Sequence, residues 1–219
     1  MLSIIIPACN EEKYLEQTIN SIRSQNHENY EIIIVCDGCT DLTEEIAKKH
    51  TSKIIKLKQR QGPAIAKNRG AELSQGSKLI FLDADTHLTP GVLREIEKIL
   101  EKRPNIVGTC RIKPSNKRLK HQILMLIKNY LLCPFGVSNG IIFCSKETFD
   151  KFKGFRNVKQ MEDGFFIRAV KKKEGFKILK TPVINSTRRF DEIGYVKIWI
   201  YWIKKALKNN LNEDYDVIR

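Results

Sequence analysis

Apolar runs and helix-spaced apolar residues alternate along the first part of the chain. Four short, mostly apolar runs have the length and composition of strands buried on both faces of a sheet, at residues 2–6, 31–36, 53–57 and 78–82. Helical spacing separates them, at residues 12–25 and 63–75 and in a segment capped by Asp41, with Glu44 as its capping-box partner. This alternation predicts a parallel sheet with right-handed helical crossovers.

Polar residues follow three of these predicted strands at the point where each strand ends. They are "PACNE" at 7–11, "DGCTD" at 37–41 and "DAD" at 83–85. The carboxyl ends of parallel strands share one edge of a sheet, and ligands of such sheets gather there. We therefore expect the three segments to line a single crevice.

The pattern is less regular in the second half of the chain. Strand-like segments occur at 106–112, 140–144 and 176–179, and helix-like segments at 119–132 and 162–173. The length of the chain and the absence of repeats or a linker predict one domain over residues 1–219. Within it we distinguish an N-terminal half at 1–100, a C-terminal half at 101–192 and an amphipathic tail at 193–219.

The charge of the chain narrows the class of its partner. A formal net charge of +14 implies an anionic partner, which is a nucleic acid, a phosphate-bearing substrate or an acidic membrane surface. The N-terminus lacks the features of a secretory signal, and the apolar stretch at 123–137 is interrupted by Lys128, Asn129 and Pro134. These features predict a cytoplasmic protein without a membrane-spanning helix.

Two of the six cysteines, Cys36 and Cys39, form a C-x-x-C pair. Such a pair can be redox-active or can supply half of a zinc site. A zinc site needs a second ligand pair at short spacing, and the other cysteines are scattered singly. We therefore expect reduced thiols.

Asp83 and Asp85 place two carboxylates directly after a buried strand. Helix capping does not require them, because Thr89 and Pro90 form a start signal for the next helix. In an extended chain, residues two apart point the same way, so both carboxylates would face one bound group. Such a pair repels itself unless a cation lies beside it. Our interpretation is a hard metal ion with a phosphate-bearing ligand.

Four further groups of charged residues have both a chemical and a structural interpretation. The acid at 37 could accept a hydrogen bond from a nucleobase or form a turn with the next glycine. The basic residues 67 and 69 follow a helix start that suits phosphate, or lie on a solvated face. The acids at 162 and 163 could include a general base, or they could simply complement the dipole of a helix. The arginines at 188 and 189 could clamp a diphosphate, or they could lie at the surface. The groups are Asp37; Lys67 and Arg69; Glu162 and Asp163; Arg188 and Arg189.

The order of these segments resembles glycosyltransferase family 2. It is carried by "IIIPACNEEKYLEQTINSI", "EIIIVCDGCTD", "GPAIAKNRGAELSQGSKLIFLDAD" and, after a "GF", "MEDGFFIRAVKKKEGFKI". The resemblance covers roughly the first 180 residues. It implies an α/β fold of the GT-A type, with a Rossmann-like, mostly parallel central sheet flanked by helices and a C-terminal acceptor-side region. It also implies an inverting enzyme with a nucleotide-sugar donor, bound by residues 1–100, and an acceptor bound by residues 101–192.

The resemblance also implies roles for individual residues. Asp83 and Asp85 match a D-x-D motif, whose first member reaches the ribose and whose second reaches a manganese or magnesium ion on the diphosphate. Asp163 matches the catalytic base. With the candidates above, the expected substrate-binding residues are Pro7, Ala8, Asn10, Glu11, Asp37, Lys67, Asp83, Glu162, Arg188 and Arg189.

Two departures from the family pattern bear on the reaction. Cys36 replaces the first acid of the Asp-Asp-Gly-Ser segment that the family often has, and the Q-x-x-R-W signature of processive synthases is missing. We therefore expect transfer of a single sugar from a UDP- or GDP-linked donor to a hydroxyl of a glycan or lipid-linked acceptor in cell-envelope glycan synthesis. A polyprenyl phosphate acceptor is the alternative, and Asp163 would then be dispensable because the attacking oxygen is already ionised.

Two further partners follow from charge and amphipathicity. Tryptophan, tyrosine and lysine in the tail at 193–210 suit a helix in a membrane interface, as does the helix at 119–132, although either could pack as a core helix. We favour peripheral attachment to the inner face of the cell membrane, through an anionic lipid surface. A non-catalytic nucleic-acid-binding module would also explain the charge, but carboxylates at strand ends repel phosphate unless a metal intervenes. We expect no nucleic-acid partner, since no signature of the usual modules is present.

Overall fold

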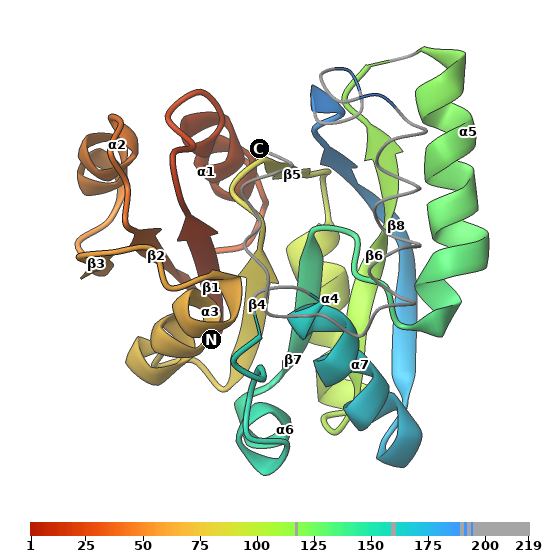
Figure 1. The fold of residues 1–219 in the computed structure, drawn as a ribbon. Coiled ribbons are helices and arrows are strands. Elements are labelled where there is room, and N and C mark those ends of the chain that lie inside the picture. The colour runs from red at the N-terminus through yellow and green to blue at the C-terminus, as the bar shows by residue number, and fades with distance from the viewer. Residues whose placement is uncertain (117, 159–160, 189–190, 192–193, 195–219) are drawn as a thin grey trace.

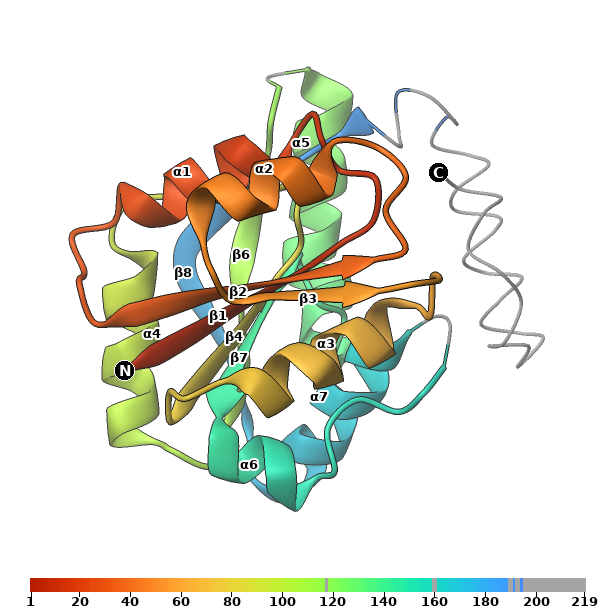
Figure 2. The same cartoon turned by 90° about the vertical axis from the view of Figure 1, so that its left-hand side faces the viewer.

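The computed structural model describes residues 1–116, 118–158, 161–188, 191 and 194 of the chain. A sheet of eight strands lies at the centre of these residues, in the order β3-β2-β1-β4-β7-β6-β8-β5, with helices on both faces (Figures 1 and 2). The predicted α/β architecture is therefore confirmed. The strands are β1 Leu2–Ala8, β2 Tyr30–Asp37, β3 Ile54–Leu57, β4 Lys78–Leu82, β5 Thr86–Leu88, β6 Val107–Pro114, β7 Ile141–Ser145 and β8 Phe176–Asn185.

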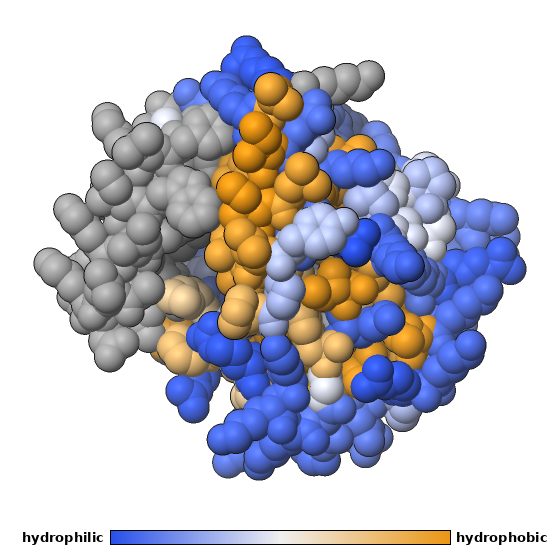
Figure 3. All heavy atoms as spheres, turned by 90° about the vertical axis from the view of Figure 1, so that its right-hand side faces the viewer, coloured by the Kyte–Doolittle hydropathy of each residue, from blue (hydrophilic) through white to orange (hydrophobic). Residues whose placement is uncertain are grey.

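The helices form two layers and one edge element. Buried side chains of α1, α2 and α4 pack on one face of the sheet, and those of α3, α6 and α7 on the other. The helix α5 lies beside β6, and a face of it is apolar and exposed (Figure 3). The bounds are α1 Leu15–Arg23, α2 Thr43–His50, α3 Pro63–Leu73, α4 Val92–Lys102, α5 Leu119–Ile127, α6 Lys146–Lys151 and α7 Glu162–Lys173. A π-helical turn, Lys128–Leu132, and a 3-10 turn, Cys133–Phe135, extend α5.

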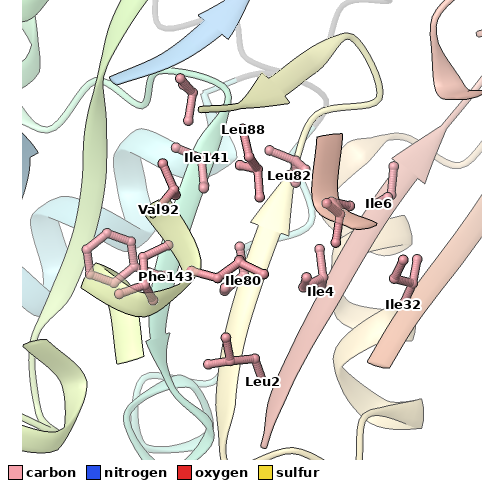
Figure 4. Packing of buried hydrophobic residues seen from close by; sticks show 14 of the residues in the cluster. Leu2, Ile4, Ile6, Ile32, Ile80, Leu82, Leu88, Val92, Ile141 and Phe143 are labelled. Atoms are coloured by element: carbon pink, nitrogen blue, oxygen red, sulfur yellow. The ribbon is translucent and has the colours of Figure 1, made fainter. Parts of the chain in front are cut away.

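The strand β1 shows why an uninterrupted apolar run is needed at the centre of the sheet. Ile4 and Ile6 join the core under α1 and α4, and the intervening Ile5 joins the core under α3 and α7. Figure 4 shows side chains of β1, β4 and β7 side by side on the first of these faces. Because neighbouring side chains of a strand point to opposite faces, a strand covered on both sides must be apolar at every position.

The two halves of the sheet differ in direction. The strands β1, β2, β3 and β4 are parallel, as the sequence predicts. The strand β7 is antiparallel to both β4 and β6, while β6 and β8 are parallel. The strands β2 and β3 are added on one side of β1, and β4 is added on its other side, so the order in which strands are added to the sheet reverses at β1. Sheets of this kind bind ligands outside the carboxyl ends of the strands at such a point.

Three local predictions are wrong in detail. The chain is not extended through Asp83–Asp85, because the N–H of Thr86 donates to the carbonyl of Asp83 at 3.0 Å and closes a turn before β5, which the sequence analysis missed. The hydroxyl of Thr89 does not cap α4 and instead donates to the carbonyl of Pro182 at 2.5 Å. Glu44 completes no capping box, since its carboxylate pairs with Lys48 and Lys56.

Other features of the sequence analysis are refined rather than overturned. Asp41 does bond the start of α2, accepting from the N–H of Thr43 at 3.0 Å. The short helix α6 was missed, and β8 extends well past residue 179. No helix among the described residues combines the length and hydrophobicity that crossing a bilayer requires. Of the predicted tail at 193–219 the structure describes Gly194 alone, so its predicted membrane helix lies outside the described residues.

Gly70 allows α3 to pack closely on the sheet. A Cβ atom there would lie 2.3 Å from Cγ2 of Ile5 and 3.3 Å from Cγ2 of Val35, in β1 and β2. Both neighbours are fully buried, so neither can move aside freely. The close approach fixes the position of α3, and with it Lys67 one turn earlier.

We predict that Gly70→Ala lowers the free energy of unfolding by about 1–3 kcal/mol, because overpacking outweighs the better helix propensity of alanine. Glu72→Ala, at an exposed position of the same helix, is the control and should change it by less than about 0.5 kcal/mol. Urea denaturation of both variants measures the difference. Equal or greater stability of Gly70→Ala would contradict the packing argument.

Candidate active site

A cavity of about 290 Å³ opens at the carboxyl ends of the parallel strands. The ends of β1, β2 and β4 contribute to it, as do the starts of α3 and α7 and the loop before β7. The expected crevice is therefore present. Its lining residues come from six parts of the chain: Pro7, Ala8, Cys9 and Glu11; Asp37; Arg60, Pro63 and Lys67; Asp83, Ala84 and Asp85; Gly136, Val137 and Ser138; and Met161, Glu162, Asp163, Gly164 and Arg168.

Asp37 joins the end of β2 to the start of α3. Its two carboxylate oxygens accept hydrogen bonds from the backbone N–H groups of Gln61, at 2.7 Å, and Gly62, at 2.9 Å. The side chain is 4% exposed. Each carboxylate oxygen has a second lone pair, so the group can accept further bonds from a ligand. The structural interpretation of Asp37, a turn with the following glycine, is thus replaced by a long-range contact to the loop before α3.

Lys67 is enclosed by carboxylates. Its ammonium donates to Oε1 of Glu162 at 2.9 Å and to Oδ1 of Asp163 at 2.5 Å. It also lies 5.2 Å from the ring centre of Phe155, part of an aromatic cluster with Phe81 and Phe149. The side chain of Lys67 is 3% exposed. This buried group of three charges joins α3 to α7.

Burial and charge act in opposite directions on these groups. Burial alone would lower the pKa of the Lys67 ammonium, but the carboxylates of Asp163, Glu162 and Asp83 together raise it. Burial raises the pKa of the Glu162 carboxyl, with Lys67 opposing this shift and Asp163 reinforcing it. Lys67 is therefore charged at any physiological pH, and it compensates two acids in a medium of low dielectric constant.

Asp163 is held on both of its oxygens. While Oδ1 accepts from Lys67, Oδ2 accepts from the hydroxyl of Ser138 at 2.7 Å. The side chain of Asp163 is more exposed than that of Glu162, at 17% against 9%. Of the two acids at the start of α7, Asp163 is thus the one that presents more of its carboxylate to the cavity.

Arg188 connects the end of the described chain to the first loop. Its Nη2 contacts both carboxylate oxygens of Glu11, at 2.7 and 2.8 Å, and lies 3.5 Å from Oδ2 of Asp85. The guanidinium stacks over Tyr14, at 4.4 Å from the ring centre. Glu11 lines the cavity and is 6% exposed, whereas Arg188 is not one of the lining residues and reaches the site through its contacts with Glu11 and Asp85.

The cavity is acidic although the protein is strongly basic. Its lining residues include six carboxylates and three cationic side chains, the latter being Arg60, Lys67 and Arg168. Within the described residues, no three His, Cys, Asp or Glu side chains are arranged to enclose a metal ion. A magnesium-like ion is commonly held by one or two carboxylates together with the phosphates of a substrate. The excess of carboxylates around Asp83 and Asp85 fits a cation of that kind.

The structure brings most of the predicted site residues to this cavity. Pro7, Ala8, Glu11, Asp37, Lys67, Asp83, Asp85, Glu162 and Asp163 all line it. Asn10 does not line the cavity. Its side chain binds Thr40, which ties the loop after β1 to the loop after β2. Arg189 lies outside the described residues.

Three charged or hydroxyl-bearing lining residues were not among the predictions: Arg60, Ser138 and Arg168. Arg60 precedes the glycine–proline pair at the start of α3, within a segment already noted for its charge. Ser138 is in an irregular segment with no sequence signal, and Arg168 belongs to a helix whose basic residues resemble an ordinary solvated face. Only the fold shows that these side chains meet.

The comparison with protein families decides the class. Residues 3–164 match the family described as glycosyl transferase family 2. The chain belongs to this family. The prediction of a glycosyltransferase is thereby confirmed, and the GT-A fold accounts for the mixed sheet described above.

Relatives of this glycosyltransferase are found among curated proteins. An uncharacterized glycosyltransferase of Haemophilus influenzae is 33% identical over 61% of this chain and 48% of its own length. The GalNAc(5)-diNAcBac-PP-undecaprenol beta-1,3-glucosyltransferase of Campylobacter jejuni is 29% identical over the same shares of the two chains. The chain thus spans about half the length of these relatives.

Solved structures of low sequence identity share the fold. Staphylococcus aureus TarS 1–349 in complex with UDP has a TM-score of 0.70 and 20% identity, over 85% of this chain and 60% of that one. The mannosyltransferase PcManGT of Pyrobaculum calidifontis, in complex with GDP-Man and Mn²⁺, has a TM-score of 0.67 and 17% identity, over 84% and 56%.

We predict that Lys67→Met lowers the free energy of unfolding by about 3–5 kcal/mol, because the buried carboxylate of Glu162 and the partly buried one of Asp163 lose their counter-charge. The pKa of the Glu162 carboxyl, which burial already raises in the folded protein, then rises further above the unfolded value of about 4, because Lys67 no longer opposes the shift. The folded state binds more protons than the unfolded state in that window, so the loss should grow as the pH rises from about 4 to 8. Urea denaturation across this pH range measures it.

Lys151→Met is the matched control for this variant. Lys151 pairs with Glu174 at 2.5 Å, but its side chain is 58% exposed. Water replaces such a partner, so the control should be close to wild type at every pH. A Lys67→Met loss that is equal at pH 5 and pH 8 would show that the cost comes from lost packing.

Proposed function

We propose that this glycosyltransferase transfers a single sugar from a UDP- or GDP-linked donor to a hydroxyl of a glycan or lipid-linked acceptor, with inversion at the anomeric carbon. The observation that carries the proposal is the arrangement of two acidic pairs around one cavity. Asp83 and Asp85 come from the end of β4, and Glu162 and Asp163 from the start of α7. Such an arrangement gives separate groups for a leaving diphosphate and an attacking hydroxyl.

The donor occupies the end of the cavity formed by β1, β2 and β4 in this proposal. Pro7 and Ala8 contact the nucleoside there. Asp37 accepts a hydrogen bond from the base through a lone pair that its bonds to the loop before α3 leave available. Asp83 binds the ribose, and Asn10 orients this loop through Thr40. The UDP complex of TarS and the GDP-Man complex of PcManGT support these two nucleotides as candidates.

Asp85 is the residue proposed to hold a manganese or magnesium ion on the diphosphate. The excess of carboxylates over cations in the cavity supports this, as does the Mn²⁺ in PcManGT. When bound, the ion would stabilise the negative charge that develops on the departing diphosphate. Arg188, anchored by Glu11 and 3.5 Å from Asp85, adds positive charge there. Arg189 lies outside the described residues and is assigned to the diphosphate from the sequence alone.

Asp163 is the proposed general base. As the acceptor oxygen forms a bond to the anomeric carbon, the bond from that carbon to the diphosphate oxygen breaks, and the diphosphate leaves with the electron pair. The proton of the acceptor hydroxyl passes to the carboxylate of Asp163. Lys67 and Ser138 fix the orientation of that carboxylate, and Glu162 shares the counter-charge of Lys67.

We predict that calorimetric titration with UDP, GDP and CDP gives tight, manganese-dependent binding of one diphosphate. Asp85→Ala should abolish the metal dependence and weaken binding by about tenfold or more, because it removes a ligand of the ion. Asp150→Ala, at an exposed position of α6, should bind as wild type. If none of the three diphosphates binds, with or without the metal, the proposed donor site is wrong.

We also predict that Asp163→Asn lowers kcat by about 10²–10⁴-fold, because an amide cannot accept the acceptor proton. Diphosphate affinity should be unchanged, and Asp150→Asn should have wild-type kcat. The measurement is transfer to a hydroxyl acceptor, with the donor that the titration identifies. A small effect in this assay would remove Asp163 as the base. The alternative acceptor, a polyprenyl phosphate whose oxygen needs no base, predicts transfer to a polyprenyl phosphate that Asp163→Asn leaves nearly unchanged.

A further inference from the structure

The helix α5 and its extension expose a row of large apolar side chains. Leu119, Ile123, Leu126 and Tyr130 recur at helical spacing and are 49–71% exposed, followed by Leu131 at 61% and Phe135 at 75%. The row forms a continuous apolar stripe on the surface (Figure 3). We call these six residues the apolar face of α5. Exposed apolar surface of this extent is uncommon in a soluble protein and marks a binding surface.

The segment of chain that carries the apolar face has charges of one sign. Residues 102–146 contain nine lysines and arginines and no aspartate or glutamate. The guanidinium of Arg111 stacks on Tyr130 at 4.9 Å, within the face itself. Lys120 is 52% exposed at its N-terminal end, where it and Arg118 pair with Asp191. A partner must therefore be apolar at its centre and anionic around it.

This combination selects a lipid bilayer over a second copy of the chain. Two copies packed through this face would bring the same basic segment against itself, at a net charge of +14 each. An anionic bilayer offers hydrocarbon beneath negatively charged headgroups, which suits an amphipathic helix lying in the interface. The helix and its extension, residues 119–135, would extend about 25 Å along such a surface.

The apolar face is continuous with the proposed active site. Phe135 ends the face, and the next three residues, Gly136, Val137 and Ser138, line the cavity. Ser138 in turn bonds Asp163 at 2.7 Å. A molecule anchored in a bilayer beneath the face would thus reach the cavity beside the proposed base.

We propose that the apolar face of α5 docks this enzyme on an anionic lipid bilayer and that its acceptor is anchored there. The second part rests on the function proposed above. Docking itself stands on the exposure and charge of the face, and it is tested without donor, metal or acceptor.

The test is co-sedimentation of the full chain with vesicles of phosphatidylcholine alone or mixed with phosphatidylglycerol. The wild type should bind the mixed vesicles, and less strongly as salt is added. Ile123→Gln with Leu126→Gln should weaken this binding by about tenfold or more, since two apolar side chains no longer enter the interface. Thermal denaturation and diphosphate titration should show that this double variant is folded.

Leu42→Gln with Leu73→Gln is the matched control. These residues are 56% and 43% exposed, close to the 55% of Leu126 and 49% of Ile123, but they lie at α2 and α3. The control should bind vesicles as wild type does. Equal loss in both double variants would mean that any exposed leucine contributes, and the face would not be a specific docking surface.

Other outcomes would also overturn the proposal. No binding of the wild type to mixed vesicles would do so, as would equal binding of the wild type and the α5 variant, which would place attachment elsewhere in the chain. Self-association of the wild type that the α5 variant abolishes would assign the face to a second copy. If the protein binds a diphosphate but not the vesicles, only the proposed docking surface is wrong. If it binds the vesicles but no diphosphate, docking stands and the proposed donor site is wrong.

Discussion

The buried contact of Lys67 with Glu162 and Asp163 is the constraint on which the site depends. It connects α3, placed by the first half of the sheet, with α7, which follows the strand β7 of the second half. Burial opposes the charged forms of both Glu162 and Lys67, and each offsets that cost for the other, with the carboxylate of Asp163 adding to the upward shift of the Lys67 pKa. The interaction therefore requires that both halves be in place at once. The left-handed backbone of Met161, with φ of 61°, turns the chain into α7 at this point.

The molecule separates its charges by location. Carboxylates are concentrated in the cavity, where six of them line the wall, while basic residues dominate the segment from 102 to 146. A uniformly basic cavity would bind phosphate without help, and a uniformly acidic one would repel it. An acidic cavity in a basic protein attracts an anionic ligand over long range and then requires a cation at close range. This makes the net charge and the acidic strand ends compatible features of one protein.

The sequence predicts the parts of the site that lie at the ends of regular elements. The position after a buried strand is readable from apolar runs, so Pro7, Ala8, Asp37 and Asp83 could be assigned to one crevice. Side-chain pairing across the chain could not be predicted, because it depends on tertiary placement. Lys67 was expected near phosphates, yet its ammonium faces two acids almost a hundred positions later. The antiparallel direction of β7 likewise has no signal in its apolar run, since both directions bury the same side chains.

Arg188 shows how a contact between distant parts of the chain can prepare a binding site. Its partner Glu11 is 177 positions away, and Nη2 lies closer to Glu11, at 2.7 Å, than to Asp85, at 3.5 Å. Tyr14 supports the guanidinium from one side. A flexible arginine side chain loses conformational entropy when a ligand orders it. Because Glu11 and Tyr14 already hold the guanidinium of Arg188, a ligand would have less of this entropy to remove. In the donor complex proposed above, a diphosphate at Asp85 would therefore meet a cation whose position the first loop determines. The loop after β1 would then act on the phosphates as well as on the nucleoside.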